Sequence, residues 1–308
     1  MTPFLSIQLS FFMSRFFLPL NTGFGALYLS VFLLSVNGLF ARSIELDSTS
    51  ITQLRSVIAG GAIIALCLLQ KRSLLVAPRS LLVVYFLGVL LGLHWVTYFQ
   101  AMQSSSVAVG ILALFTHPVF TVLLEPIFQG RRPEGKDLLA ALVVAGGITV
   151  MVSAQLGGSD QLSAEQIRTG VFWGVGSALL FAFRNTAQKY WLHHVPSTSL
   201  MFHQVLVVAL MLAAFTDWSA VSGMAPINWL LLLLLGSFCT AGAHTFVSVA
   251  LKHLPAKTVA LISCLQPVLA ALFAWLILSE KPAIQVLLGG AIIVAVAAFE
   301  SRTQHKIE

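Results

Sequence analysis

The sequence predicts an all-α membrane protein whose ten transmembrane helices form two inverted five-helix repeats. Apolar residues make up 58% of the 308 residues, charged residues only 9%, and the mean hydropathy is +0.92. Because a soluble domain carries about 25% charged residues, this composition excludes a soluble globular protein. Apolar segments of roughly 20 residues, the length that crosses about 30 Å of hydrocarbon as a helix, recur along the chain.

Hydrophobic runs separated by short polar loops predict where the ten helices lie. They are expected at residues 22–41, 50–69, 80–101, 106–127, 137–154, 169–190, 198–216, 228–250, 257–278 and 284–300. The longest connection, QLGGSDQLSAEQIR (155–168), divides them five and five. We therefore expect a first repeat over 21–155, a connecting loop over 156–168, a second repeat over 169–301 and a cytoplasmic tail over 302–308.

The N-terminal segment, residues 1–20, is apolar but is interrupted by Arg15 and Pro19 and offers no small-residue cleavage site. These features argue against a cleaved signal peptide, and we expect the segment to lie in the cytoplasm. Met13, followed by Ser14, offers an alternative start, which would make residues 1–12 an upstream extension.

The distribution of basic residues predicts which way the protein sits in the membrane, because cytoplasmic loops carry an excess of Lys and Arg. With the N-terminus inside, twelve lysines and arginines fall in cytoplasmic segments. Only Arg42, Arg168 and Lys281 fall on the opposite side. This bias predicts that both termini are cytoplasmic.

An internal repeat becomes visible when the sequence is shifted by 149 residues. FTHPVFTVLLEP (115–126) then falls on CLQPVLAALFAW (264–275), and Pro118 falls on Pro267. A proline inside a helix removes a backbone hydrogen bond, and such a break is tolerated in a membrane where protein or a water-filled cavity satisfies the freed carbonyl. Five spans per half require opposite orientations, a common plan of secondary transporters with a midplane site. A simple kink in the helix is the alternative.

Polar side chains recur at helical spacing within the predicted spans. His117, Thr121 and Glu125 share one face of the fourth helix, and a similar stripe around His244 lies on the eighth. Unpaired polar groups are unfavourable in hydrocarbon, so these face other helices or water; hydrogen bonding between helices is the alternative to a polar pathway. The candidate substrate-binding residues are Asn37, His94, Trp95, Tyr98, His117, Asn185, His244 and Gln266.

Few ionisable groups lie within the spans. For Arg55, early in the second helix, snorkelling to the interface and a role in anion binding or gating are equally good explanations. Arg184 and Glu125 lie near the cytoplasmic ends of their helices, where snorkelling is the simple explanation. Glu125 is the only acid well inside a span, so proton coupling through a carboxylate would have to use it.

The sequence gives no signal for a catalytic centre, a cofactor or a metal site. The three cysteines (Cys67, Cys239, Cys264) fall in apolar spans without a CxxC pair, so neither disulfides nor metal binding are expected. GRRPEGKD (130–137) lacks the Ser or Thr of a phosphate-binding loop, and no nucleic-acid partner is expected. Glycine pairs at 146–147 and 289–290 permit close helix contacts within one chain or, equally, in a homodimer.

These features together resemble the EamA-type transporters of the drug/metabolite transporter superfamily. The resemblance covers about residues 21–301 and is carried by Arg55, AMQSSSVAVG (101–110), LEPIFQGRRP (124–133) and ALKHLPAKTVALISCLQPVLAALFAWLILSEKP (250–282). It implies a carrier of the bacterial inner membrane, often an exporter of amino acids or other small metabolites, that works by alternating access through a central cavity. The His-Pro and Glu-Pro pairs of the fourth helix depart from the family pattern and leave the substrate open.

The leading hypothesis is therefore a secondary transporter for a small polar or amphipathic metabolite. Trp95 and Tyr98 would contact an apolar part of the substrate. The residues expected to form hydrogen bonds with it are Asn37, His117, Asn185, His244 and Gln266. A membrane-embedded enzyme would need a clustered acid-base or metal constellation, which scattered histidines do not supply. A channel or scaffold is the third hypothesis, and saturable flux would distinguish a carrier from a pore.

Overall fold

The computed structural model describes residues 23–37, 43–156, 163–278 and 283–305, and these fold into helices and turns without a strand. The N-terminal segment 1–20 with its alternative start lies outside the described residues, as do residues 157–162 of the connecting loop and the last three residues of the chain. The expectations for those segments therefore stay predictions.

The first half of the chain supplies five spans. They are α2 (Gly23–Ser35), α4 (Ser48–Leu69), α5 (Pro78–Ser104), the broken pair α6 (Val107–Leu114) and α7 (His117–Phe128), and α8 (Gly135–Leu156). Asp47 begins α4 because its carboxylate accepts from the backbone N–H groups of Thr49 and Ser50, and Pro78 begins α5 at a position where a helix needs no N–H.

The second half supplies the other five. They are α9 (Ala164–Trp191), α10 (Ser197–Leu212), the run of α12 (Pro226–Leu234), the π-helix η2 (Leu235–Gly242) and α13 (Ala243–His253), the broken pair α14 (Ala256–Ser263) and α15 (Leu265–Leu278), and α16 (Ile284–His305). A short 3-10 helix η1 (Ala213–Phe215) and the helix α11 (Trp218–Ser222) connect α10 to α12.

The described residues contain eight helical segments that are long and apolar enough to cross a membrane, and α2 and α9 complete the ten predicted spans. The described part of α2 has only 13 residues. Helix α9 has 28, but its buried face carries Ser177, Arg184, Asn185 and Gln188, which make it the most polar of the set. The predicted ten-helix, all-α membrane fold is confirmed.

The helix boundaries reproduce the duplication found in the sequence. Helices α6 and α14 have the same length and lie 149 residues apart at both ends, and so do α8 and α16. Helices α4 and α10 also begin 149 residues apart, at Ser48 and Ser197. The duplication is therefore expressed helix by helix, including the position at which the fourth and ninth spans break.

One pair of spans differs by a single residue. The unbroken α5 begins at Pro78, and its counterpart begins at Pro226, only 148 residues later, whereas Ala101 and Ala250 are 149 apart. The eighth span therefore contains one additional residue, and the π-helix η2 accommodates it, with the Thr240 hydroxyl donating to the carbonyl of Leu235 over 3.0 Å. Insertions of this kind often mark functional sites.

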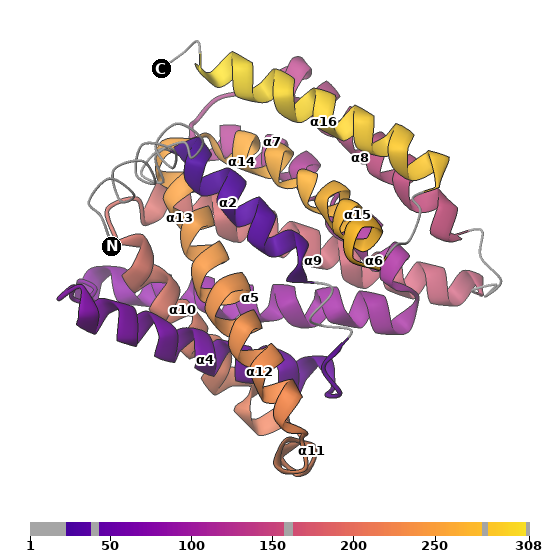
Figure 1. Cartoon of the computed structure of the whole chain (residues 1–308). Coiled ribbons are helices and arrows are strands. Elements are labelled where there is room, and N and C mark those ends of the chain that lie inside the picture. Colours follow the sequence, from indigo (N-terminus) through magenta and orange to yellow (C-terminus); the bar gives the residue numbers. More distant parts are fainter. Residues whose placement is uncertain (1–22, 38–42, 157–162, 279–282, 306–308) are drawn as a thin grey trace, which may run out of the picture.

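The two halves pack as an approximate two-fold arrangement. Helices α8 and α16 are counterparts and pack against each other, as do α4 and α10; α8 and α16 are seen side by side in Figure 1. Helix α7 of the fourth span packs against α14 of the ninth, the equivalent span of the second half. The contact of α5 with α9 is repeated by that of α13 with α2. Because each half has five spans, two halves related in this way lie in opposite orientations, as predicted.

A close backbone contact joins the last span of each half. A Cβ atom on Gly289 would lie 2.3 Å from the carbonyl oxygen of Gly147 and 2.6 Å from the backbone nitrogen of Met151, so only glycine fits there. One member of each predicted glycine pair therefore serves contact within the chain. Gly146 has open space beside it.

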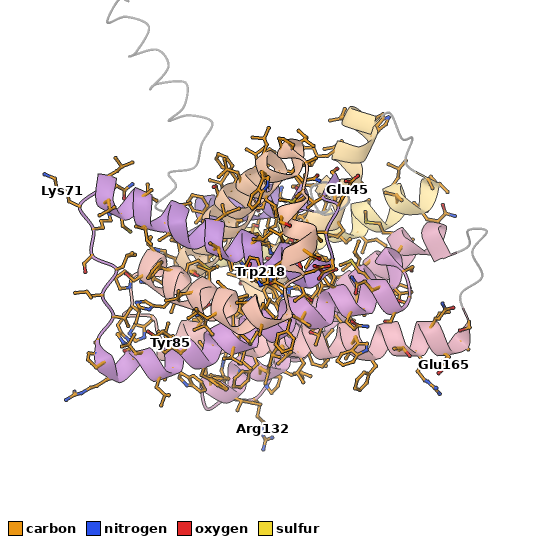
Figure 2. All side chains as sticks on the ribbon, turned by 90° about the horizontal axis from the view of Figure 1, so that it is seen from below. Glu45, Lys71, Tyr85, Arg132, Glu165 and Trp218 are labelled. Carbon is orange, nitrogen blue, oxygen red and sulfur yellow. The ribbon has the colours of Figure 1, made fainter. Side chains whose placement is uncertain are left out.

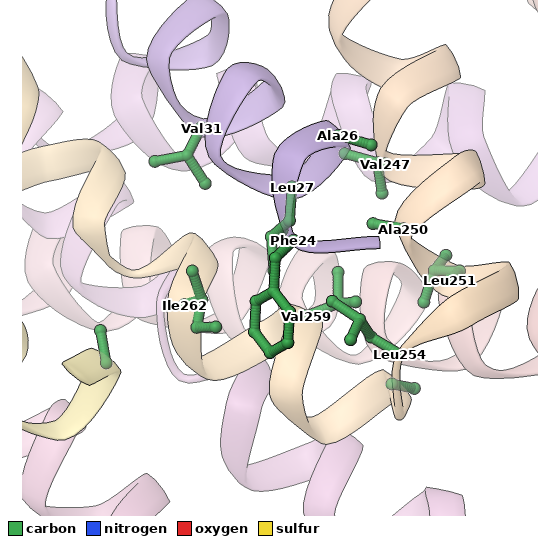
Figure 3. Close-up of a cluster of buried hydrophobic side chains, with 12 residues drawn as sticks. Phe24, Ala26, Leu27, Val31, Val247, Ala250, Leu251, Leu254, Val259 and Ile262 are labelled. Atoms are coloured by element: carbon green, nitrogen blue, oxygen red, sulfur yellow. The ribbon is translucent and has the colours of Figure 1, made fainter. Parts of the chain in front are cut away.

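Helix α2 is held by apolar contacts from the second half. Figure 3 shows Phe24, Leu27 and Val31 of α2 against Val247 and Leu251 of α13 and against Val259 and Ile262 of α14. Because lipid tails are as apolar as these side chains, their close fit rather than the exclusion of water holds the helices together.

The outer surface suits a lipid environment. Large apolar side chains are exposed on most spans, and α16 alone exposes Ile284, Leu287, Leu288, Val294 and Phe299. Figure 2 shows Lys71 and Glu165 at opposite ends of the bundle, which agrees with the predicted placement of their loops on opposite sides.

Candidate functional site

The two helix breaks lie where their prolines require them. A proline cannot donate to the carbonyl four residues earlier, and its ring clashes with that carbonyl. For Pro118 that residue is Leu114, where α6 ends, and for Pro267 it is Ser263, where α14 ends. Pro118 and Pro267, the predicted helix breaks, each lie in the first turn of the helix that follows a break.

His117 satisfies the carbonyl that Pro118 frees. Its Nδ1 lies 3.3 Å from the carbonyl oxygen of Leu114, and because a carbonyl only accepts, Nδ1 carries the hydrogen. The ring is 98% buried, it meets Phe181 of α9 edge to face with centroids 5.1 Å apart, and its Nε2 has no partner among the described residues. The break thus leaves one free acceptor nitrogen inside the bundle.

His94 joins α5 to α9 near the same phenylalanine. Its Nδ1 donates to the hydroxyl of Ser177 over 2.8 Å, and that hydroxyl donates back to the His94 carbonyl over 2.9 Å. The imidazole stacks on Phe181 with centroids 4.6 Å apart and on Tyr98 at 6.5 Å. Phe181 therefore separates two buried histidines from different helices.

Trp95 lies between Arg55 and His244. The guanidinium carbon of Arg55 is 4.2 Å from the centre of the indole ring, and the His244 ring meets the indole edge to face at 5.2 Å. All three side chains are buried, and Nε of Arg55 and Nδ1 of His244 have no hydrogen-bond partner in the described part of the chain. We call Arg55, His94, Trp95, His117, Phe181 and His244 the central cluster.

Trp95 and His244 also occupy equivalent positions of the two repeats, 149 residues apart. Their contact places the central cluster where the two halves meet. Arg55 has Gln204 as its counterpart at the same shift, so the repeats differ in charge at this position.

Arg184 is buried and held by amide oxygens, which corrects the prediction that it snorkels. One terminal nitrogen donates to Oδ1 of Asn185 over 2.8 Å, and the other donates to Oε1 of Gln204 on α10. The side chain has no exposed surface. Polar partners on the neighbouring helix remove the reason for the guanidinium to reach the interface.

Glu125 is also buried, so the snorkelling prediction is wrong there too. Its carboxylate accepts from the Tyr190 hydroxyl over 2.8 Å and from the backbone N–H groups of Ala256 and Lys257 over 2.7 Å each. These N–H groups open α14, where a helix favours a negative charge. We call Glu125, Tyr190, Ala256 and Lys257 the Glu125 network, and it ties α7 of the first half to α14 of the second.

Further contacts surround this network at the end of the bundle predicted to be cytoplasmic. Lys257 pairs with Asp137 over 2.6 Å, and Lys189 donates to the carbonyl oxygens of Leu251 and Leu254 over 3.0 and 2.6 Å. A small pocket lies beside them, lined by Gln188, Lys189, Leu192, His193, Leu200, Ser248, Leu251 and Lys252.

The remaining predicted residues divide into two groups. Asn185 and Tyr98 lie next to Arg184 and His94, as described above. Asn37, just after α2, and Gln266, at the start of α15, are half-buried and have no hydrogen bond to the described residues. The described contacts do not bring Asn37 and Gln266 into the central cluster.

Two residues of the site escaped sequence reasoning. Phe181 reads as an ordinary apolar residue of a span, although it lies four residues after Ser177 and so on the same helical face. Gln204 follows His203 in an otherwise apolar stretch. It lies 149 residues after Arg55, at the equivalent position of the second repeat, and this spacing is a signal in the sequence.

The central side chains contact one another, so the wide cavity expected from the sequence is closed in the described structure. The buried centre combines two guanidiniums, unpaired imidazole nitrogens and aromatic faces. Such a set can hold an anionic or hydrogen-bonding solute against flat apolar surfaces. The described residues contain no cluster of three or more His, Cys, Asp or Glu side chains that could hold a metal ion.

The chain is similar to known transporters along most of its length. The sequence model of the EamA-like transporter family matches residues 21–153 and 168–301. A protein of Archaeoglobus fulgidus described as an uncharacterized transporter is 27% identical over 277 residues, covering 89% of this chain and 94% of that protein. The pseudopaline exporter CntI of Pseudomonas aeruginosa is 26% identical over 264 residues, covering 85% and 89%.

A eukaryotic protein and a solved structure show the same similarity. Human solute carrier family 35 member G1 is 25% identical over 286 residues, covering 89% of this chain and 77% of that protein. A crystal structure superposes with a TM-score of 0.77 over 92% of this chain and 97% of the other, at 21% identity. At that identity the superposition shows a shared fold.

Proposed function

The chain belongs to the EamA-like transporter family of the drug/metabolite transporter superfamily, and from this premise we propose that it exports small metabolites by alternating access. It is a multi-pass membrane transporter rather than an enzyme, with a small-molecule substrate and a lipid environment. The export direction is an analogy with the pseudopaline exporter. Amino acids and related metabolites are the proposed cargo class.

The central cluster is the main support for this proposal. Its side chains come from five spans of both repeats, all but the half-buried Phe181 are buried, and several of their polar atoms lack partners. Unpaired polar groups inside a membrane protein are unfavourable and mark solute pathways. A solute that binds there exchanges contacts with both halves, which is what a rocking motion between repeats requires.

The Glu125 network supports a gate at the end predicted to be cytoplasmic. It closes the path between α7 and α14, and the breaks after Leu114 and Ser263 divide both spans near their middle. We propose that α7 and α14 separate during the cycle, and that Pro118 and Pro267 permit the movement. Glu125 and Arg55 are the proposed gating or coupling residues.

The candidate residues would each contact a different part of the substrate. Trp95 and Tyr98 would contact an apolar part of the substrate, while His94, His117, Asn185 and His244 form hydrogen bonds with it. Asn37 and Gln266 would join them when the bundle opens. We propose a bacterial inner-membrane location with both termini in the cytoplasm, and a homodimer is a further proposal.

A two-step experiment tests the function. Metabolites are profiled in medium and cells with and without the protein, and the metabolite that changes most is then loaded into proteoliposomes of the purified full chain. A carrier gives a flux that saturates and is stimulated by substrate on the opposite side. A flux that grows linearly with concentration, without such stimulation, would show a channel instead.

Replacing His117 by Ala and, separately, Gln266 by Ala tests the site in the same assay. The loss of either side chain is expected to weaken transport. Normal transport by both variants would contradict the midplane assignment. Leu142→Ala, on the exposed face of α8, serves as the matched control.

A further inference from the structure

Among the described residues, the centre of the protein carries positive charge without an acid paired to it. The ion pairs of the described residues join Arg131 and Lys136 to Glu134, and Lys257 to Asp137, and all three lie at one end of the bundle. Neither buried arginine, Arg55 or Arg184, takes part in one. A buried charge without a counter-ion is unfavourable, so its presence calls for a compensating partner.

Arg184 has such partners within the chain, but Arg55 does not. Arg184 donates to two amide oxygens, whereas the Arg55 side chain makes no hydrogen bond to any described residue. It lies against aromatic rings instead. The guanidinium carbon is 4.2 Å from the ring centre of Trp95 and 5.7 Å from that of Phe99. Cation–π contact compensates only in part for a lost hydration shell.

The guanidinium of Arg55 favours a planar acceptor. A guanidinium is planar and presents its N–H groups as a rigid fork in that plane. A carboxylate matches that edge with two parallel hydrogen bonds, which gives a strong and directional contact. The unpaired Nδ1 of His244, whose ring meets the same indole edge to face, offers a second polar contact.

Comparison of the two repeats indicates a single cationic residue for binding a carboxylate. The counterpart of Arg55 is Gln204, which is neutral and already accepts from Arg184. The π-helix η2 adds to the asymmetry, because Gly236 within it lies so close to α4 that a Cβ there would be 3.0 Å from the Arg55 carbonyl oxygen. At these equivalent positions of the second and seventh spans, the two repeats therefore carry one cationic side chain, Arg55 of the first half.

We propose that Arg55, with Trp95 against its guanidinium and His244 against the same indole, binds the carboxylate of the transported substrate, and that the substrate is a small organic carboxylate. The proposal rests on the proposed function and names its substrate class. It predicts that a carboxylate group on the cargo, rather than its apolar part, decides recognition.

Thermal stability in detergent tests the proposal with matched pairs of probes. Phenylacetate, glutarate and N-acetylphenylalanine are each compared with the corresponding amide, using the purified full chain. We expect at least one carboxylate to raise the melting temperature in a saturable way and its amide to have no effect. If no carboxylate stabilises the protein, or each amide stabilises it equally, the proposal is wrong.

Variants connect the effect to Arg55. In Arg55→Gln the apparent affinity for the stabilising carboxylate should fall roughly thirtyfold or more, because a buried charged partner is lost. The unliganded variant should be about as stable as the parent, since the buried charge of Arg55 is only partly compensated by the aromatic rings. Arg131→Gln, which alters an exposed loop arginine, is the matched control and should leave the affinity unchanged.

Transport assays separate this inference from the proposed function. If Arg55→Gln exports the metabolite identified in cells at the parental rate, the protein is a transporter but Arg55 is not its anion anchor. If neither protein transports any solute while the carboxylate still stabilises the parent and not the variant, the anion site stands and the proposed function fails.

Discussion

Trp95 and His244 meet edge to face with ring centroids 5.2 Å apart, and they occupy equivalent positions of the two repeats. Two residues related by a two-fold arrangement can touch only near its axis. Their contact therefore marks the point where the halves meet, and Arg55 lies over the same indole. A relative movement of the halves must change this contact.

The first prediction concerns the indole. Trp95→Leu removes the aromatic face over which Arg55 lies, a contact worth about 2 kcal/mol when desolvated. We expect the variant to lose stability and to show a weaker carboxylate-induced rise in melting temperature. Trp95→Phe keeps an aromatic face and should retain most of both. Equal behaviour of the Leu and Phe variants would contradict a role for the ring in supporting Arg55.

The second prediction concerns the Glu125 network. Glu125→Gln replaces a carboxylate that accepts three hydrogen bonds by an amide with one oxygen, and hydrogen bonds to charged groups contribute about 1.5–3 kcal/mol each. The gate at the end predicted to be cytoplasmic should open more often. A cysteine introduced at Ser248, which lines the pocket at this end, should then react with maleimide roughly tenfold faster in a background without the three native cysteines.

The control for this measurement is Glu134→Gln. Glu134 is exposed in the loop between α7 and α8, where its hydrogen bond and proximity to Lys136 lower the pKa of its carboxyl group below the usual value. Its loss should leave the labelling rate unchanged. Labelling that is equally slow in Glu125→Gln and in the parent would show that the network is not the gate.

The third prediction concerns the break between α6 and α7. Pro118→Ala restores a backbone N–H that can donate to the carbonyl of Leu114, which His117 now satisfies. We expect a straighter fourth span, a higher melting temperature and slower transport. Pro226→Ala, at the first position of α12 where no backbone bond is missing, should change neither quantity. Faster transport by Pro118→Ala would contradict the assigned role of the break.

Much of this architecture was predictable because it follows from local rules. Hydrophobic runs located the tenth span at 284–300 against the observed Ile284–His305, and the two prolines located both breaks. The shift of 149 residues anticipated the common ends of α6 and α14. The π-helix was not predicted, because one additional residue in an apolar span leaves no mark in composition.

The candidate site was less predictable because it depends on which helices meet. Sequence position alone suggested that Arg184 and Glu125 reach the interface, but the acceptors of Arg184 include Gln204 on another helix and the donors to Glu125 lie 65 and more residues away. Periodicity identifies a polar face without naming its partner. The role of Phe181 between two histidines likewise arises only from the contact of α5, α7 and α9.

The last prediction separates contact within the chain from contact between copies. Gly289→Ala places a Cβ atom within 2.3 Å of the Gly147 carbonyl oxygen, and backbone atoms cannot move aside as a side chain can. Overpacking of this kind costs about 1–3 kcal/mol, so the melting temperature should fall. Gly146→Leu, directed into open space on the outer face of α8, should not affect the fold of one chain. If α8 forms a homodimer through that face, Gly146→Leu will lower the dimer fraction in cross-linking while transport per folded chain persists; an unchanged dimer fraction would place any dimer contact elsewhere.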